Sequence, residues 1–192
     1  MLNSEFIEFV NSIFPNFPDD VKDRAKASIQ QFEIEGKQKP WLMSSPLDML
    51  SQGDIISNIP FFYFDKDGRQ KLFIADGILI STSCHIDHKD KLSFAPVFPI
   101  DVYPGVIDEL KRNTVYDYMY IQDTILSDKY IDFEIINTYE KELITSSLSS
   151  GKVKRISSLN DLGYYVFIIK LTVYLLRRED QDTLNKRGEE VQ

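Results

Sequence analysis

Cysteine, histidine and basic side chains are scarce in this sequence. The chain of 192 residues has one cysteine and two histidines, and its 22 Lys and Arg residues stand against 30 Asp and Glu residues. A single cysteine excludes an intramolecular disulfide framework. The formal net charge of −8 argues against broad, non-specific attraction to nucleic acid, because phosphate neutralisation requires clustered Lys and Arg side chains. A local basic patch is still compatible with this balance.

A hydrophobic run long enough to cross a membrane is also missing. The longest run, LGYYVFIIKLTVYLL at 162–176, has 15 residues and contains Lys170, whereas a spanning helix needs about 20 apolar residues. We therefore expect a buried packing helix there. Glu5 and Glu8 interrupt the apolar residues at the N-terminus, so no signal peptide is expected. Together these features predict a cytoplasmic protein with no membrane partner.

The sequence does contain enough apolar residues for a core, with 43% hydrophobic and 12% aromatic residues. Residues 1–36 carry two segments of helical periodicity, NSEFIEFVNSIF and PDDVKDRAKASIQQF, which Pro15 and Pro18 separate. This pattern predicts an N-terminal helical hairpin. Residues 37–52 are predicted to form a linker, with Trp41 as its anchor.

From residue 53 onward the pattern changes to short β-strands, which alternate β-favouring and polar residues. The predicted strands are DIISNIPFFYF, KLFIADGILIST, KLSFAPVFPI, TVYDYMYIQ and KYIDFEII. DKDG at 65–68 predicts a hairpin turn, and Pro60 predicts a bulge or an edge position. STSCHIDHKD at 81–90 is expected to connect two strands without a helix, and PGVIDELKRN to form a short helix.

These elements predict one α+β domain over residues 53–180, followed by a solvated tail at 181–192. Several short strands with tight turns and one packing helix favour a small, strongly bent antiparallel sheet or an SH3-like, partly closed barrel. The predicted helical hairpin would precede it, and the packing helix would lie at its C-terminal end.

The order of four short motifs resembles a known family. QGDII at 52–56, DKDGRQ at 65–70, ILIS at 78–81 and LSFAPV at 92–97 follow one another as in the core of the MazF/PemK-like toxins. The resemblance covers roughly residues 52–100. It implies an SH3-like barrel and a metal-independent endoribonuclease without cofactors, usually dimeric and usually held in check by an antitoxin. We therefore expect a divergent barrel protein of a bacterial toxin–antitoxin or defence system.

Two functional positions of that family are not matched here. The family's arginine precedes the strand that corresponds to ILIS, and Ala75 and Asp76 stand there. The family's hydroxyl side chain follows the Ala-Pro strand, where this chain has Phe98, Pro99 and Ile100. Phosphate cleavage needs a cation near the developing negative charge. The candidate catalytic residues are therefore the hairpin cations and the serine that ends ILIS: Arg69, Lys71 and Ser81.

Two further groups of residues are candidates for contact with RNA. The densest basic segment, SSGKVKRISSL, supplies three candidate nucleic-acid-binding residues, Lys152, Lys154 and Arg155, although such a run is equally typical of a solvated strand edge. The tyrosines of TVYDYMYIQ share one strand face and could either stack on bases or pack against the sheet.

The only cysteine and both histidines lie within five positions, Cys84 to His88. Cys84, His85 and His88 are ligand types that zinc accepts, yet structural zinc sites normally draw ligands from two separated pairs. A thiol with a neighbouring histidine is also the pair that nucleophilic catalysis uses. The third interpretation is a polar turn in which Ser83, Asp87 and Asp90 cap backbone groups while Cys84 and Ile86 are buried as small hydrophobes. All three alternatives stay open at this stage.

Two classes of function follow. The first is a nuclease-like protein that acts on RNA. The second is a non-catalytic protein-interaction module, such as an acidic immunity or antitoxin-like protein, for which complementary charge would speed association with a basic partner. RNA, a cognate protein and a second copy of the chain are thus the candidate partners. A concave basic patch with Arg69 and Lys71 would favour RNA, and an acidic or apolar face would favour a protein.

Overall fold

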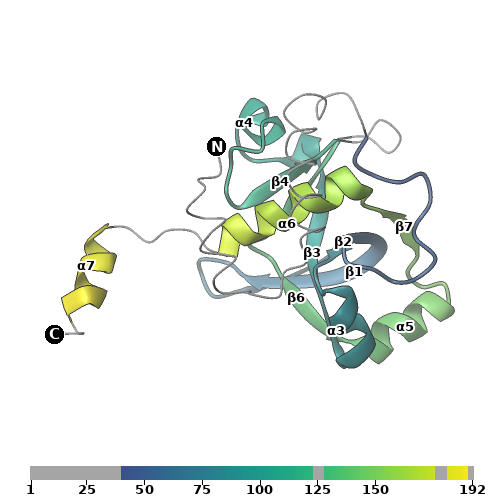
Figure 1. Cartoon of the computed structure of the whole chain (residues 1–192). Helices are drawn as coiled ribbons and strands as arrows, with labels where there is room; N and C mark the ends of the chain where they lie inside the picture. The colour runs from purple at the N-terminus through teal and green to yellow at the C-terminus, as the bar shows by residue number, and fades with distance from the viewer. Residues whose placement is uncertain (1–39, 123–127, 176–180, 190–192) are drawn as a thin grey trace.

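The computed structural model describes residues 40–122, 128–175 and 181–189. This part of the chain is α+β, with a seven-stranded antiparallel sheet and five α-helices (Figure 1). The strand path begins at β4 and ends at β7 without closing on itself. The predicted helical hairpin at 1–36 and the first residues of the predicted linker lie outside the described residues.

Three pairs of adjacent strands in the sheet are consecutive in sequence: β1 with β2, β2 with β3, and β4 with β5. The other pairs join strands that are distant in sequence: β3 with β5, β3 with β6, and β1 with β7. The order of the sheet is β4-β5-β3-β2-β1-β7, and β6 pairs with β3 on the side opposite β2, next to β5. The strands are β1 Asp54–Phe64, β2 Gln70–Leu79, β3 Lys91–Pro99, β4 Tyr118–Ile121, β5 Lys129–Asp132, β6 Asn137–Glu140 and β7 Arg155–Ser158.

A bulge divides β1 into a base and a projecting arm. The register of β1 against β2 shifts between Ile56 and Ile59, and Asn58 there has a positive φ of 59°. Pro60 follows at once, as the sequence predicted for a bulge. Before the bulge β1 pairs with both β2 and β7, and after it with β2 alone. The arm is a two-stranded ribbon that ends in the predicted hairpin turn, where Gly68 has a φ of 74°.

Five helices accompany the sheet in the described residues. They are α3 Ser83–His88, α4 Ile107–Lys111, α5 Lys141–Ser149, α6 Asp161–Leu175 and α7 Gln181–Glu189, with a 3₁₀ turn at Ile100–Val102. The predicted short helix is α4 and the predicted packing helix is α6. The predicted solvated tail contains α7, whose described side chains are exposed or half-buried.

The prediction that residues 81–90 form no helix is wrong. Thr82 caps α3 by accepting a hydrogen bond from the His85 N–H, and Ile86 is buried beneath the helix. At the other end the Lys141 amino group donates to the Ile86 carbonyl. Lys141 belongs to α5, 55 positions away in sequence, so the sequence near α3 could not reveal this support.

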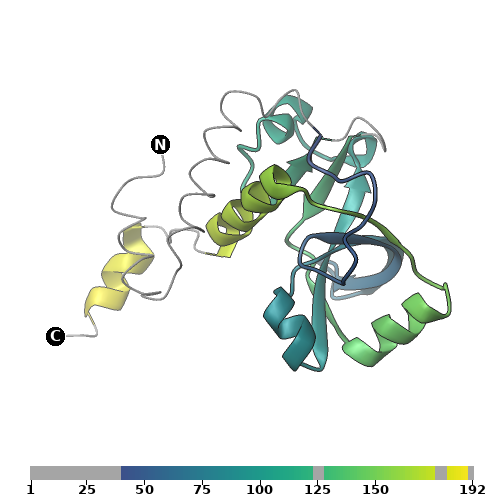
Figure 2. The same cartoon turned by 45° about the vertical axis from the view of Figure 1, so that its right-hand side comes forward.

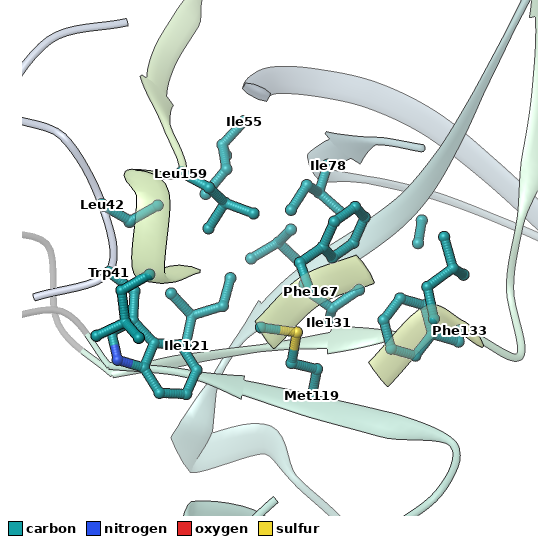
Figure 3. Packing of buried hydrophobic residues seen from close by; sticks show 14 residues of the cluster. Trp41, Leu42, Ile55, Ile78, Met119, Ile121, Ile131, Phe133, Leu159 and Phe167 are labelled. Atoms are coloured by element: carbon teal, nitrogen blue, oxygen red, sulfur yellow. The ribbon is translucent and has the colours of Figure 1, made fainter. Parts of the chain in front are cut away.

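Helices cover both faces of the sheet at its base. On one face α6 contributes Phe167 and Leu171 to a cluster with the strand residues Ile55, Ile78 and Val97 (Figure 3). On the opposite face α3 and α5 lie at one end of the molecule, away from α4 (Figures 1 and 2). They bury Ile86 and Ile144 against strand residues that include Phe61, Leu79 and Phe94.

The segment before β1 is part of this core. Trp41 is buried, its N–H donates to the Gln122 carbonyl, and its own carbonyl accepts from the Asn160 N–H. Gly163, in the first turn of α6, allows the helix to approach this segment. A Cβ atom on Gly163 would lie 2.5 Å from the Trp41 carbonyl oxygen, so the helix and the Trp41 backbone meet closely only because the side chain is absent.

We expect Gly163→Ala to lower the free energy of unfolding by about 2–3 kcal/mol, because relief of overpacking against backbone requires a shift of α6. The gain in helix propensity, about 1 kcal/mol, opposes this loss. Gly77→Ala is the matched comparison, since its Cβ would meet the side chains of Ile59 and Phe61 at 3.0 and 3.1 Å. Urea unfolding of both variants checks the prediction, and a Gly163→Ala midpoint equal to that of the unmodified chain would contradict it.

Candidate functional site

The two predicted catalytic cations lie at the tip of the β1–β2 ribbon and pair with carboxylates of the same turn. Arg69 Nη1 lies 3.8 Å from Asp67 Oδ2, and Lys71 Nζ lies 3.4 Å from Asp65 Oδ2. Asp65 Oδ1 also accepts hydrogen bonds from the backbone N–H groups of Asp67 and Arg69. The tip is therefore a turn of mixed charge in which Arg69 and Lys71 each have a carboxylate neighbour.

Ser81, the third predicted catalytic residue, lies just beyond the opposite end of β2. Its side chain is buried, and its Oγ accepts a hydrogen bond of 2.9 Å from the Ser93 N–H. About ten residues of chain, roughly 30 Å of extended strand, separate Ser81 from Lys71. The structure does not bring Ser81 beside the two cations, and the catalytic role of all three residues stays a prediction.

The predicted nucleic-acid-binding segment divides into one half-buried and two exposed cations. Arg155, on β7, donates from Nε and Nη2 to Oδ2 of the buried Asp54 at 2.9 and 2.8 Å. Asp54 also accepts from the Ser158 hydroxyl and from the Ser51 N–H. Arg155 thus holds β1, β7 and the segment before β1 together. Lys152 and Lys154 are exposed beside it and remain candidates for phosphate contact.

Cys84, His85 and His88 all lie on α3 and are exposed. Cys84 and His88 are four residues apart and therefore lie on the same side of the helix. Throughout the described ranges, no group of three or more His, Cys, Asp and Glu side chains is placed to hold a metal ion. Ile86 is buried, as the turn interpretation expected, but Cys84 is exposed and the segment is a capped helix, so that interpretation is wrong on both of these points.

The largest chemical feature of the ribbon is an exposed apolar surface, which sequence reasoning did not identify. Residues paired across antiparallel strands share a face, and so do alternate residues along one strand. The register pairs Pro60 with Ile74 and Phe62 with Leu72, and Phe64 follows on the same face. All five are exposed. We call this surface the ribbon face: Pro60, Phe62, Phe64, Leu72 and Ile74.

The ribbon face is the outward continuation of the face that α6 covers at the base. Ile78 lies under α6, Asp76 follows two residues earlier, and Ile74 is the first residue of the ribbon face. Asp76 marks the border, where its Oδ2 accepts a hydrogen bond of 2.8 Å from Lys129 Nζ. The opposite face of the ribbon is packed, because Phe73 stacks on Phe61 and meets Phe98, both at 5.6 Å between centroids.

Side chains from β6 close the free edge of β1 along this ribbon. The Phe62 N–H donates to Asn137 Oδ1 at 2.7 Å, and Asn137 Nδ2 donates to the Phe62 carbonyl at 3.1 Å. The Tyr139 hydroxyl donates to the Pro60 carbonyl. The Asn137 amide therefore satisfies the backbone groups that a further strand would use, which is one way in which proteins protect an exposed edge.

The sequence did contain a signal for the ribbon face. FFYF and LFI, on either side of the DKDG turn, are apolar at consecutive positions, whereas a strand with one solvated face alternates apolar and polar residues. Two apolar faces on a hairpin indicate either burial on both sides or a binding surface. The sequence could not decide between these, because it does not say where the covering helix ends.

A second cluster of titratable groups lies where β4 and β5 meet α6. Lys170 is buried in α6 and donates to the carbonyls of Asn113, at 2.9 Å, and Val115. Burial lowers the pKa of Lys170 to about 8. Burial and the neighbouring Glu134 and Asp117 raise the pKa of Asp132 to about 6, although the Glu134 N–H donates to its carboxylate. These groups are partnered within the fold, so we assign the cluster a structural role.

We expect Asp54→Ala to lower the free energy of unfolding by about 3–5 kcal/mol, because it leaves the half-buried Arg155 guanidinium and the Ser158 hydroxyl without their acceptor. Lys154→Ala is the control; it removes an exposed neighbour of Arg155 and should change stability by less than about 0.5 kcal/mol. Urea titrations followed by circular dichroism measure both. Equal midpoints for the two variants would show that the Asp54 network contributes little.

Asp132 predicts a pH dependence of stability. Its pKa is raised in the folded state, so the protonated carboxyl favours folding below about pH 4, and this contribution is lost as the pH rises through about 6. The loss should be on the order of 2 kcal/mol. Asp132→Asn keeps the acceptor for the Glu134 N–H and removes the titration. Unfolding free energies at pH 4 and pH 7 should converge in this variant, and an unchanged pH slope would contradict the assignment.

Comparisons with known proteins do not assign the chain: no protein family and no curated protein sequence matches it. Within the described ranges, none of the helices combines the length and the apolar character that crossing a bilayer requires. The resemblance to the MazF/PemK-like core therefore rests on the motifs between residues 52 and 100, and function has to be argued from the surfaces that the fold exposes.

Proposed function

We propose that this protein is a non-catalytic protein-interaction module and that its binding surface is the ribbon face. One observation carries the proposal: the arm of β1–β2 exposes a row of large apolar side chains on one face while its other face is packed. Phe62, Phe64, Leu72 and Ile74 are 43%, 64%, 73% and 71% exposed. Single apolar residues on a surface need no explanation, but a continuous patch is typical of a binding site.

The size of the patch supports the proposal. If a large apolar side chain has about 200 Å² of accessible surface, the four exposures add to roughly 500 Å². The largest apolar patch on a typical monomer covers about 300–600 Å² and is often functional. The ribbon face reaches this range, and a ribbon that projects beyond the helix-covered base offers it without obstruction from α3, α5 or α6.

The charges near the ribbon favour a protein partner over RNA. The turn carries three cations: Arg69 and Lys71 each lie beside a carboxylate of the same turn, and Lys66 is exposed between Asp65 and Asp67 in sequence. Arg155 is directed at Asp54 rather than at solvent. A surface that tracks a phosphate backbone needs clustered cations without such neighbours. An apolar face is the outcome that we expected for the protein-interaction class.

We further propose that the module is a divergent relative of the MazF/PemK-like proteins, with a function in a toxin–antitoxin or defence system. The support is the succession of β1, β2 and β3 as consecutive antiparallel strands that carry the QGDII, ILIS and LSFAPV motifs in order. The bulge at Asn58 bends β1 as a small SH3-like barrel would require.

RNA binding is the second candidate function, because Lys152 and Lys154 are exposed together at the start of β7. A site there would lie away from the ribbon, at the other side of the bulge. The first proposal places a protein on the ribbon face, and the second places RNA at Lys152 and Lys154. One experiment can therefore separate them.

Site-specific photo-crosslinking in cells that natively produce the chain tests the proposal. Benzoylphenylalanine at Leu72 should give a covalent adduct with a protein, because this position lies within the ribbon face and the probe is itself apolar. The same probe at Lys154 is the control and should give far less protein adduct. The absence of a protein adduct at Leu72 would overturn the proposal, and an RNA adduct at Lys154 would favour the second candidate.

A further inference from the structure

We infer that the occupant of the ribbon face is the ribbon face of a second copy of this chain. Two chains would then associate about a two-fold axis, with their β1–β2 ribbons stacked face to face. The inference rests on the proposed function, since it names the partner for the same surface. Four observations on the described residues carry it: area, chemical character, charge and the state of the strand edges.

The area is sufficient for a specific contact. A two-fold interface uses the same patch on both chains. Each ribbon face exposes roughly 500 Å², so stacking would remove about 1,000 Å² from water before any surrounding residue is counted. A biological interface should bury at least about 1,000 Å² in total. The ribbon faces alone therefore reach the lower limit, and their rims would add to it.

The chemical character of the face matches itself. Its five side chains carry no charge and no hydrogen-bonding group, and the one polar side chain that the register places beside them, Gln70 opposite Phe64, lies at the exposed tip. Face-to-face sheets pack about 10 Å apart with interdigitated side chains. Phenylalanines on β1 and branched aliphatic residues on β2 supply side chains of different shape for this interdigitation. A partner with a basic or acidic surface would find no complementary group on the ribbon face.

Charge also favours approach through the ribbon. Residues 60–76 contain three cations and three carboxylates and are neutral. The formal charge of −8 therefore lies entirely outside this segment. Two copies that approach through other surfaces bring like charges together, which is unfavourable. The arm is thus the part of this acidic protein where a second copy meets the least repulsion.

The strand edges distinguish stacking from edge-to-edge pairing. Asn137 and Tyr139 occupy the edge of β1. In the described part of the chain, β2 pairs only with β1 between Gln70 and Ala75, so a second copy could add there as a strand. Such pairing would join two ribbon faces into one larger exposed apolar surface, whereas stacking removes both from water. Burial of apolar area is the larger favourable term, and it selects the stacked arrangement.

Sedimentation equilibrium of the purified full chain tests the inference. The unmodified chain should be a dimer at micromolar concentration. Leu72→Glu should raise the dissociation constant at least roughly 100-fold, because it places a carboxylate in the centre of the contact. Leu143→Glu, which changes an equally large exposed residue on α5, is the matched control and should remain dimeric. Circular dichroism verifies that both variants are folded.

A charge-complementation experiment makes the test specific. Leu72→Glu and Leu72→Lys should each be monomeric, and their mixture should recover a dimer, because apposed faces bring the opposite charges together. A monomeric unmodified chain, or a dimer that Leu72→Glu leaves intact, would overturn the stacked dimer. The crosslink at Leu72 keeps the two proposals apart: an adduct with a different protein overturns the second copy and supports the interaction module, whereas an adduct between two copies supports both.

Discussion

The packing of α6 against one face of the sheet is the interaction on which the other features of this structure depend. This packing ends where the β1–β2 ribbon begins. α6 buries the strand residues that lie beneath Phe167 and Leu171. The β1–β2 ribbon continues past the Asp76–Lys129 ion pair with the same apolar character but without that cover. Hydrophobic burial is the main favourable term in folding, so an apolar face left open at one end is the feature that a functional account has to explain.

The base is built to hold the ribbon in a fixed direction. Asp54, at the start of β1, connects β7 through Arg155 and Ser158 and the preceding segment through Ser51. A buried carboxylate is tolerated because every donor around it is directed at it. Gly163 lets α6 rest on the Trp41 backbone. A rigid base and a bulge at Asn58 aim the arm outward, as a binding surface on a scaffold requires.

Three of the cations singled out in the sequence, Arg69, Lys71 and Arg155, lie beside carboxylates. Arg69 and Lys71 come from a turn rich in aspartate, and the turn geometry that Asp65 stabilises keeps the carboxylates beside them. Arg155 is needed inside the fold. Carboxylates outnumber cations in this chain, 30 to 22, and the surface without charge is then the more distinctive one. This contrast favours recognition through apolar area over recognition through phosphate.

The sequence by itself determined the elements that depend on local physics. The DKDG turn follows from residues that accept a hairpin geometry, and α6 from a long apolar run. The bulge at Asn58 lies two residues before Pro60, whose missing N–H predicted an irregularity there. Tertiary structure decided the rest. The end of α3 is supported by Lys141, which is distant in sequence, and Arg155 became structural because β7 lies beside β1. Which apolar face of the ribbon stays open was also decided there, since both faces carry apolar residues in the sequence; α6 does not reach one of them, whereas Phe73 packs on Phe61 and Phe98 on the other.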